Sequence, residues 1–132
     1  MKSRVFALAL AIAIAPIAAH GQEGTPPSID EMAFCASVQD RAPAGVDTAF
    51  ASTVEAIYCF TRVSGADAGT SVTHVWYYGD REMARVELAV GGSPWRTWSS
   101  KKVLPEWQGG WRVDVLSGAG NVLRSESFVM RP

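Results

Sequence analysis

Apolar and polar residues alternate along much of this chain, with the two-residue period of strands that bury one face. Turns rich in Gly, Pro, Ser and Asp separate the alternating segments at intervals of about eight to twelve residues. The predicted strands span residues 32–38, 53–63, 72–78, 82–90, 95–103, 111–115 and 122–130. This pattern predicts an all-β fold, an antiparallel β-sandwich of about seven strands that is immunoglobulin-like or fibronectin-like in outline.

The clearest strand pair is a hairpin. Segments 72–78 and 82–90 flank the dipeptide Gly79-Asp80, which is typical of two-residue hairpin turns. The second segment has one apolar face, made of Ala84, Val86, Leu88 and Val90. Segment 53–63 is instead apolar on both faces, which predicts a central strand covered on both sides.

Two segments have a weaker pattern. Residues 32–38 alternate like a strand, but Ser28 and Glu31 form a capping-box pattern that would instead start a helix. Residues 41–47 contain Pro43 and Gly45 and are expected to form a loop.

The N-terminus has the features of a secretory signal peptide over residues 1–21. Lys2 and Arg4 precede an apolar run of about 15 residues, shorter than the ~20 needed to span a bilayer. Ala19 and Gly21 place small residues before a predicted cleavage site, although a retained anchor is the alternative. We expect a flexible leader over 22–30, a single domain over 31–132, and a periplasmic or secreted protein.

The charge of the mature chain argues against two classes of partner. Cleavage removes Lys2 and Arg4, which leaves ten basic residues against thirteen acidic ones and a net charge of −3. This balance disfavours nucleic acid, whose phosphates need a basic surface. It also disfavours electrostatic docking on anionic membranes, and no membrane span is expected after cleavage.

The two cysteines, Cys35 and Cys59, are expected to form a disulfide in an oxidising compartment. Closing a loop of about 25 residues would contribute on the order of 3 kcal/mol. Two buried thiols in neighbouring strands, or a redox or metal pair, are the alternatives. His74 is the only mature histidine and no C-x-x-C occurs, so neither a metal site nor any other cofactor is predicted.

No catalytic motif emerges from the sequence. His74 shares a predicted strand face with Trp76 and Tyr78, and we expect it to be hydrogen-bonded at a sheet surface or hairpin. No Gly-x-Ser-x-Gly elbow accompanies the serines, and no spacing selects a pair of carboxylates. The chain is therefore predicted not to be an enzyme.

All five tryptophans lie between Trp76 and Trp111. Trp76 and Trp111 are expected in the core, and Trp107 lies in a predicted loop as the best candidate for an exposed indole. On segment 95–103, Trp95 and Thr97 face one way while Arg96 and Trp98 face the other, with Lys101 expected nearby. Such an aromatic floor suits sugar rings or an anionic group held by Arg. The alternative is a cation–π pair of Arg96 and Trp98 that only covers the sheet.

Three tryptophan-bearing motifs carry a family resemblance: His74–Tyr78, Trp95–Lys101 and Trp107–Val113. Together with Phe34-Cys35 and Tyr58-Cys59-Phe60, they resemble the bacterial domain-of-unknown-function family 2914, most strongly over residues 70–129. The resemblance implies an exported or membrane-tethered β-rich domain. It implies no activity, cofactor or ligand.

These observations favour an exported, non-catalytic binding or interaction domain of the bacterial cell envelope, working through an aromatic face or a strand edge. The expected partner is a cell-wall polysaccharide or an envelope protein. The candidate ligand-binding residues are Trp107, Trp98, Arg96, His74 and Lys101. The alternatives are an envelope hydrolase that uses His74 with a nearby serine or carboxylate, and a purely structural accessory subunit.

Overall fold

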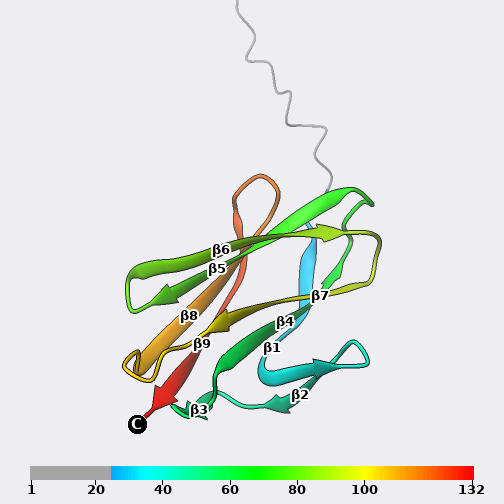
Figure 1. Ribbon diagram of the computed structural model, residues 1–132. Coiled ribbons are helices and arrows are strands. Elements are labelled where there is room, and N and C mark those ends of the chain that lie inside the picture. The colour runs from blue at the N-terminus through cyan, green and yellow to red at the C-terminus, as the bar shows by residue number, and fades with distance from the viewer. Residues whose placement is uncertain (1–24) are drawn as a thin grey trace, which may run out of the picture.

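The computed structural model describes residues 25–132, so the predicted signal peptide at 1–21 lies outside the described residues. The described chain contains nine strands and no helix (Figure 1). The strands are β1 (Ser28–Gln39), β2 (Ala42–Val46), β3 (Ala49–Ala51), β4 (Ala56–Ser64), β5 (Thr70–Tyr78), β6 (Arg81–Val90), β7 (Trp95–Lys102), β8 (Gly109–Leu116) and β9 (Val122–Arg131). Over residues 25–132, no helix is long and apolar enough to cross a membrane.

Two packed sheets form the predicted all-β sandwich. Sheet A has the strand order β2-β1-β4-β7, and sheet B has the order β3-β9-β8-β5-β6. All neighbouring strands are antiparallel except the short β3, which pairs parallel to β9. The fold class is confirmed, and β4 is a central strand of sheet A as its two apolar faces predicted.

The predicted number of strands was too low because β2 and β3 are edge strands with weak apolar patterns. Residues 42–46 pair with β1 instead of forming the expected loop. An edge strand tolerates Pro43, whose missing N–H removes no bond in the sheet interior. Residues 28–39 form β1, so the helix suggested by the capping-box pattern is wrong, and the last three residues of the expected leader belong to the sheet.

The core fills the space between the two sheets. Trp76 and Trp111 are almost fully buried there, as predicted, at 0% and 1% exposure. Phe128 of β9 stacks on Trp111 with an interplanar angle of 13°. Removing each of these large side chains from water contributes on the order of 2–3 kcal/mol. The core between the sheets also contains Phe34, Ile57, Cys59, Val63, Val72, Val113 and Val115.

The β1–β2 hairpin folds back over sheet A. β1 pairs with β4 only as far as Cys35, which lies opposite Tyr58. At the hairpin tip, the Arg41 carbonyl accepts a hydrogen bond of 3.4 Å from Arg96 Nη1, and the Arg41 guanidinium lies 5.5 Å from the centre of the Trp95 ring. Because β2 and β7 are opposite edges of sheet A, this contact requires the hairpin to cross the outer face, the side turned away from sheet B (Figure 1).

The predicted disulfide between Cys35 and Cys59 is not formed, and both thiols are free and buried. The register explains why: Cys35 lies opposite Tyr58, and Cys59 lies opposite Phe34. Side chains alternate between the faces of a strand, so Cys59 points into the core with Phe34 while Cys35 points to the outer face. Burial raises the pKa of both thiols, which keeps them protonated.

Candidate functional site

The outer face of sheet A carries an unusual concentration of aromatic side chains. Phe60 of β4 lies between Ala33 and Trp98 on the neighbouring strands. The next row of the same face holds Tyr58 opposite Ser100. We call Tyr58, Phe60 and Trp98, with Arg62 and Arg96 beside them, the aromatic face.

Trp98 is the accessible part of this face. Its ring lies nearly parallel to that of Phe60, at 15° with centroids 6.3 Å apart. Phe60 is only 1% exposed although it points away from the core, and Trp98 is its neighbour on the outer face. Trp98 and Tyr58 are both half-buried. A flat indole held against a second ring is therefore presented at the surface.

Two arginines adjoin this aromatic surface. Arg62 and Arg96 are directly opposite each other on β4 and β7, and both are exposed. Like charges in such cross-strand pairs destabilise a sheet. The ion pairs of residues 25–132 are Arg85–Glu82, Arg112–Asp114 and Arg124–Glu126, so neither of these two guanidiniums forms an ion pair there. Glu31 of β1 nevertheless lies directly opposite Arg62 on its other side. Apart from the Arg96 N–H that donates to the Arg41 carbonyl, their N–H groups remain available for an anionic group.

The alternation predicted for β7 is confirmed. It also corrects the expected site, because Lys101 does not share a face with Trp98. Trp95 packs against the core cluster, whereas Trp98 lies on the outer face with Arg96. Lys101 has the parity of Trp95 and therefore points to the inner side, away from Trp98. The cation–π contact here joins Arg41 to Trp95, and Arg96 donates to the Arg41 carbonyl.

Trp107 and Lys101 lie together elsewhere, at the end of the sandwich. The Lys101 ammonium is 5.2 Å from the centre of the Trp107 ring. The Trp107 carbonyl accepts a hydrogen bond of 3.0 Å from the Trp111 indole, and the two rings are 6.2 Å apart. Trp107 is half-buried against the core, so it is not the freely exposed indole that its loop position suggested.

His74 is buried between the sheets, with 0% exposure, and not at a sheet surface. Its Nδ1 lies 2.6 Å from Ser99 Oγ and its Nε2 lies 3.2 Å from Thr61 Oγ1. The Thr61 hydroxyl donates to the Thr97 carbonyl at 3.0 Å, so it must accept from Nε2–H. The Trp76 indole donates to Ser99 at 3.1 Å, and Ser99 in turn donates to Nδ1. The network thus fixes one neutral tautomer of His74.

Burial lowers the pKa of His74 to about 4, and desolvation is the cause. The neutral ring and the Ser99 hydroxyl resemble a base and a nucleophile, but Ser99 is only 5% exposed. No substrate can reach this pair without separation of the sheets. Its hydrogen bonds instead connect β5 of sheet B to β4 and β7 of sheet A, which indicates a structural role.

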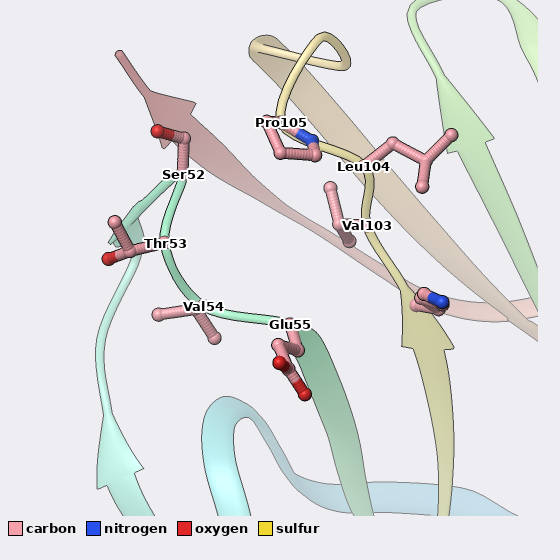
Figure 2. Close-up of a pocket in the computed structure, with 8 residues that line it drawn as sticks. Ser52, Thr53, Val54, Glu55, Val103, Leu104 and Pro105 are labelled. Atoms are coloured by element: carbon pink, nitrogen blue, oxygen red, sulfur yellow. The ribbon is translucent and has the colours of Figure 1, made fainter.

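A pocket of about 520 Å³ lies at the end of the sandwich between two loops. Figure 2 shows residues 52–55 facing residues 103–105 across it. A hydrogen bond of 3.0 Å from the Val103 amide to the Glu55 carbonyl joins the two loops. None of the five predicted ligand-binding residues lines this pocket, whose lining consists of Ser52, Thr53, Val54, Glu55, Lys102, Val103, Leu104 and Pro105.

The structure thus separates the predicted site residues into three places. Trp98 and Arg96 share the aromatic face, Trp107 and Lys101 form a pair at the end of the sandwich, and His74 is in the core. Local sequence patterns did not identify Tyr58, Phe60 and Arg62 as partners of Trp98. The signal for the first two was the second apolar face of segment 53–63.

Comparison with known proteins gives a family match over part of the chain but no function. Residues 69–130 match DUF2914, a protein family of unknown function, which confirms the resemblance carried by the tryptophan motifs. The matched segment includes Trp98 and Arg96 but not β1, β2 or β4. No curated protein matches the chain.

Proposed function

We propose that this DUF2914 protein is an exported, non-catalytic binding domain of the bacterial cell envelope, and that its aromatic face recognises a glycan bearing carboxylate groups. The observation that carries the proposal is the half-buried indole of Trp98 beside two unpaired arginines, Arg62 and Arg96. Export is supported by the signal-peptide features of residues 1–21.

The chemistry of the face suits such a ligand. A pyranose ring has apolar faces of C–H groups that pack on a flat indole, and Trp98 supplies one. Guanidinium groups bind carboxylates through paired N–H donors, and Arg62 and Arg96 lie side by side at the edge of the same surface. A ligand carboxylate placed between them would also relieve the repulsion of the two like charges.

Co-sedimentation with isolated cell-wall sacculi tests the proposal. We expect the wild type to sediment, and a Trp98→Ala variant to lose about tenfold in affinity, which corresponds to about 1.4 kcal/mol of stacking. A Trp98→Phe variant should keep part of the binding because a smaller aromatic ring remains. Tyr77→Ala is the matched control, since Tyr77 is a half-buried aromatic on the outer face of sheet B.

Thermal melts of each variant separate binding from folding. Trp98 covers Phe60, so we expect Trp98→Ala to lower the melting temperature but to leave a cooperative transition. Sedimentation of Trp98→Ala at the wild-type level would contradict the proposal. Failure of the wild type to sediment would also contradict it, and would direct the search to a protein partner.

A further inference from the structure

We propose that the β1–β2 hairpin is a movable cover of the aromatic face, and that the ligand binds the form in which the hairpin has lifted. The part concerning the ligand rests on the proposed function above. The movement of the hairpin does not, and it can be measured without any ligand.

The contacts at the hairpin tip are few and weak. The hydrogen bond from Arg96 to the Arg41 carbonyl is 3.4 Å long, beyond the usual range for N–H···O bonds. The second contact is the Arg41 guanidinium at 5.5 Å from the Trp95 ring centre, near the limit of cation–π geometry. Asp40 and Arg41 form the turn with φ of 50° and 62°, which side chains rarely adopt.

The hairpin can move as a unit because its pairing is independent of the rest of sheet A. The β1–β4 ladder ends at Cys35, and β2 pairs with β1 alone. The junction lies near Gly45, which has φ of 71°, a backbone conformation that favours glycine. A Cβ at this position would lie 3.0 Å from the Ala36 Cβ, so the two strands of the hairpin approach each other closely at its base.

Lifting the hairpin would enlarge the binding surface. Phe60 and Cys35 point to the outer face yet are only 1% and 0% exposed. Sheet B lies on the other side of sheet A, so the hairpin is the element that covers them from outside. With the hairpin lifted, Phe60 would join Trp98 and Tyr58 in one continuous aromatic platform.

The two free cysteines provide a direct test. Cys35 lies at the base of the hairpin, pointing to the outer face, and Cys59 lies in the core on the opposite face of sheet A. We expect a thiol reagent, with the sites resolved by mass spectrometry, to label Cys35 at least about tenfold faster than Cys59, because local opening requires less free energy than unfolding. Equal rates for the two thiols would show that only unfolding exposes them and would overturn the proposal.

Substitutions at the hairpin sharpen the test. Gly45→Ala introduces a strained φ and a close contact without changing charge, so it should raise the Cys35 labelling rate about tenfold and leave the Cys59 rate unchanged. Arg41→Ala, which removes a tip contact, should act in the same direction. The matched control is Gly79→Ala, a left-handed glycine of the β5–β6 turn with open space around it, which should not change Cys35. A parallel rise at Cys59 in both hairpin variants would overturn the proposal.

Binding to sacculi completes the test. If the ligand requires the lifted form, Gly45→Ala should raise the affinity by the factor by which it raises Cys35 labelling, because the affinity is reduced by the fraction of competent molecules. Faster labelling with unchanged affinity would overturn the role of the hairpin as a cover of the binding site. Absence of wild-type binding would instead refute the proposed function, while the labelling rates would still report the movement.

Discussion

The outer faces of the two sheets use their polar groups in opposite ways. On sheet B, Arg112 donates to Asp114 at 3.0 Å and its guanidinium lies 4.3 Å from the centre of the Tyr77 ring. Ser125 donates to the same carboxylate at 2.6 Å. On sheet A, Arg62 and Arg96 face each other next to an aromatic surface, and neither forms an ion pair in the described chain, although Glu31 lies opposite Arg62.

The difference separates a face that is complete by itself from one that is not. The charges of Arg112 and Asp114 on sheet B are satisfied within the fold, so this part of the face needs only water outside it. The aromatic face keeps two like charges together and covers its rings with a hairpin held at its tip by long contacts. A ligand can therefore gain more at sheet A than at sheet B.

The largest effect on stability is expected from a change in the hydrogen-bond network that joins the two sheets. Ser99→Ala removes the group that the Trp76 indole and His74 Nδ1 share, which leaves two buried polar groups without this partner. Each such loss costs about 1–3 kcal/mol, so we expect the free energy of unfolding to fall by about 2–5 kcal/mol. Chemical denaturation measures this. A change below about 1 kcal/mol would show that the network does not hold the sheets together.

Acid should lower the stability of the whole fold, because His74 belongs to the same network that joins the two sheets. His74 has a pKa of about 4 in the folded protein and about 6.5 when exposed, so the unfolded chain binds more protons between these values. Stability is therefore expected to fall as the pH falls from about 6.5 towards 4, by up to about 3 kcal/mol from this group. Denaturation at several pH values measures the slope. Stability that stays constant over this window would contradict the neutral, buried state of His74.

The arginines of the two faces should differ in how much they contribute to stability. Arg112→Gln breaks an ion pair with Asp114, whose side chain is only 15% exposed, and should cost about 1 kcal/mol. Arg62→Gln removes one of two opposed like charges but also the charge that faces Glu31, so the two effects should nearly cancel and stability should change little while sacculus binding weakens. Paired thermal melts compare the two. A loss of stability from Arg62→Gln as large as that from Arg112→Gln would mean that the Arg62 guanidinium is already satisfied within the fold.

The smallest effect is expected from salt. Salt screens the attraction between exposed guanidiniums and a ligand carboxylate. Binding of the wild type should therefore weaken a few-fold as the salt concentration rises from about 0.05 to 0.15 M. Arg96→Gln should reduce this dependence, and Arg85→Gln, which changes a paired arginine of sheet B, should not. Equal salt dependence in all three proteins would place the electrostatic contact away from the aromatic face.

Much of this fold follows from the sequence, because alternation with period two identifies most of the strands. The two apolar faces of segment 53–63 also correctly predicted a central strand, β4. The β1–β2 hairpin was not predicted, since Pro43 and Gly45 favour a loop and only tertiary contacts hold those residues as an edge strand. The hairpin that covers the aromatic face could therefore not be predicted from the local sequence pattern.

The site was less predictable because it depends on pairing between distant segments. Trp98 and Phe60 are neighbours only through the β4–β7 register. The same holds for His74, whose partners Thr61 and Ser99 are 13 and 25 residues away. The β1–β4 register also determines whether a disulfide can form. It is offset by one residue from a Cys35–Cys59 pair, so the two cysteines lie on opposite faces of adjacent strands. Local spacing contains none of this information.

The most direct test of the aromatic face is an NMR titration that follows the five tryptophan indole N–H resonances during addition of solubilised peptidoglycan fragments. Single Trp→Phe variants assign the resonances. We predict that the Trp98 resonance shifts with ligand concentration, while those of Trp76 and Trp111 stay constant because both are buried between the sheets. A shift of Trp107 with no change at Trp98 would place the ligand at the end of the sandwich and contradict this account.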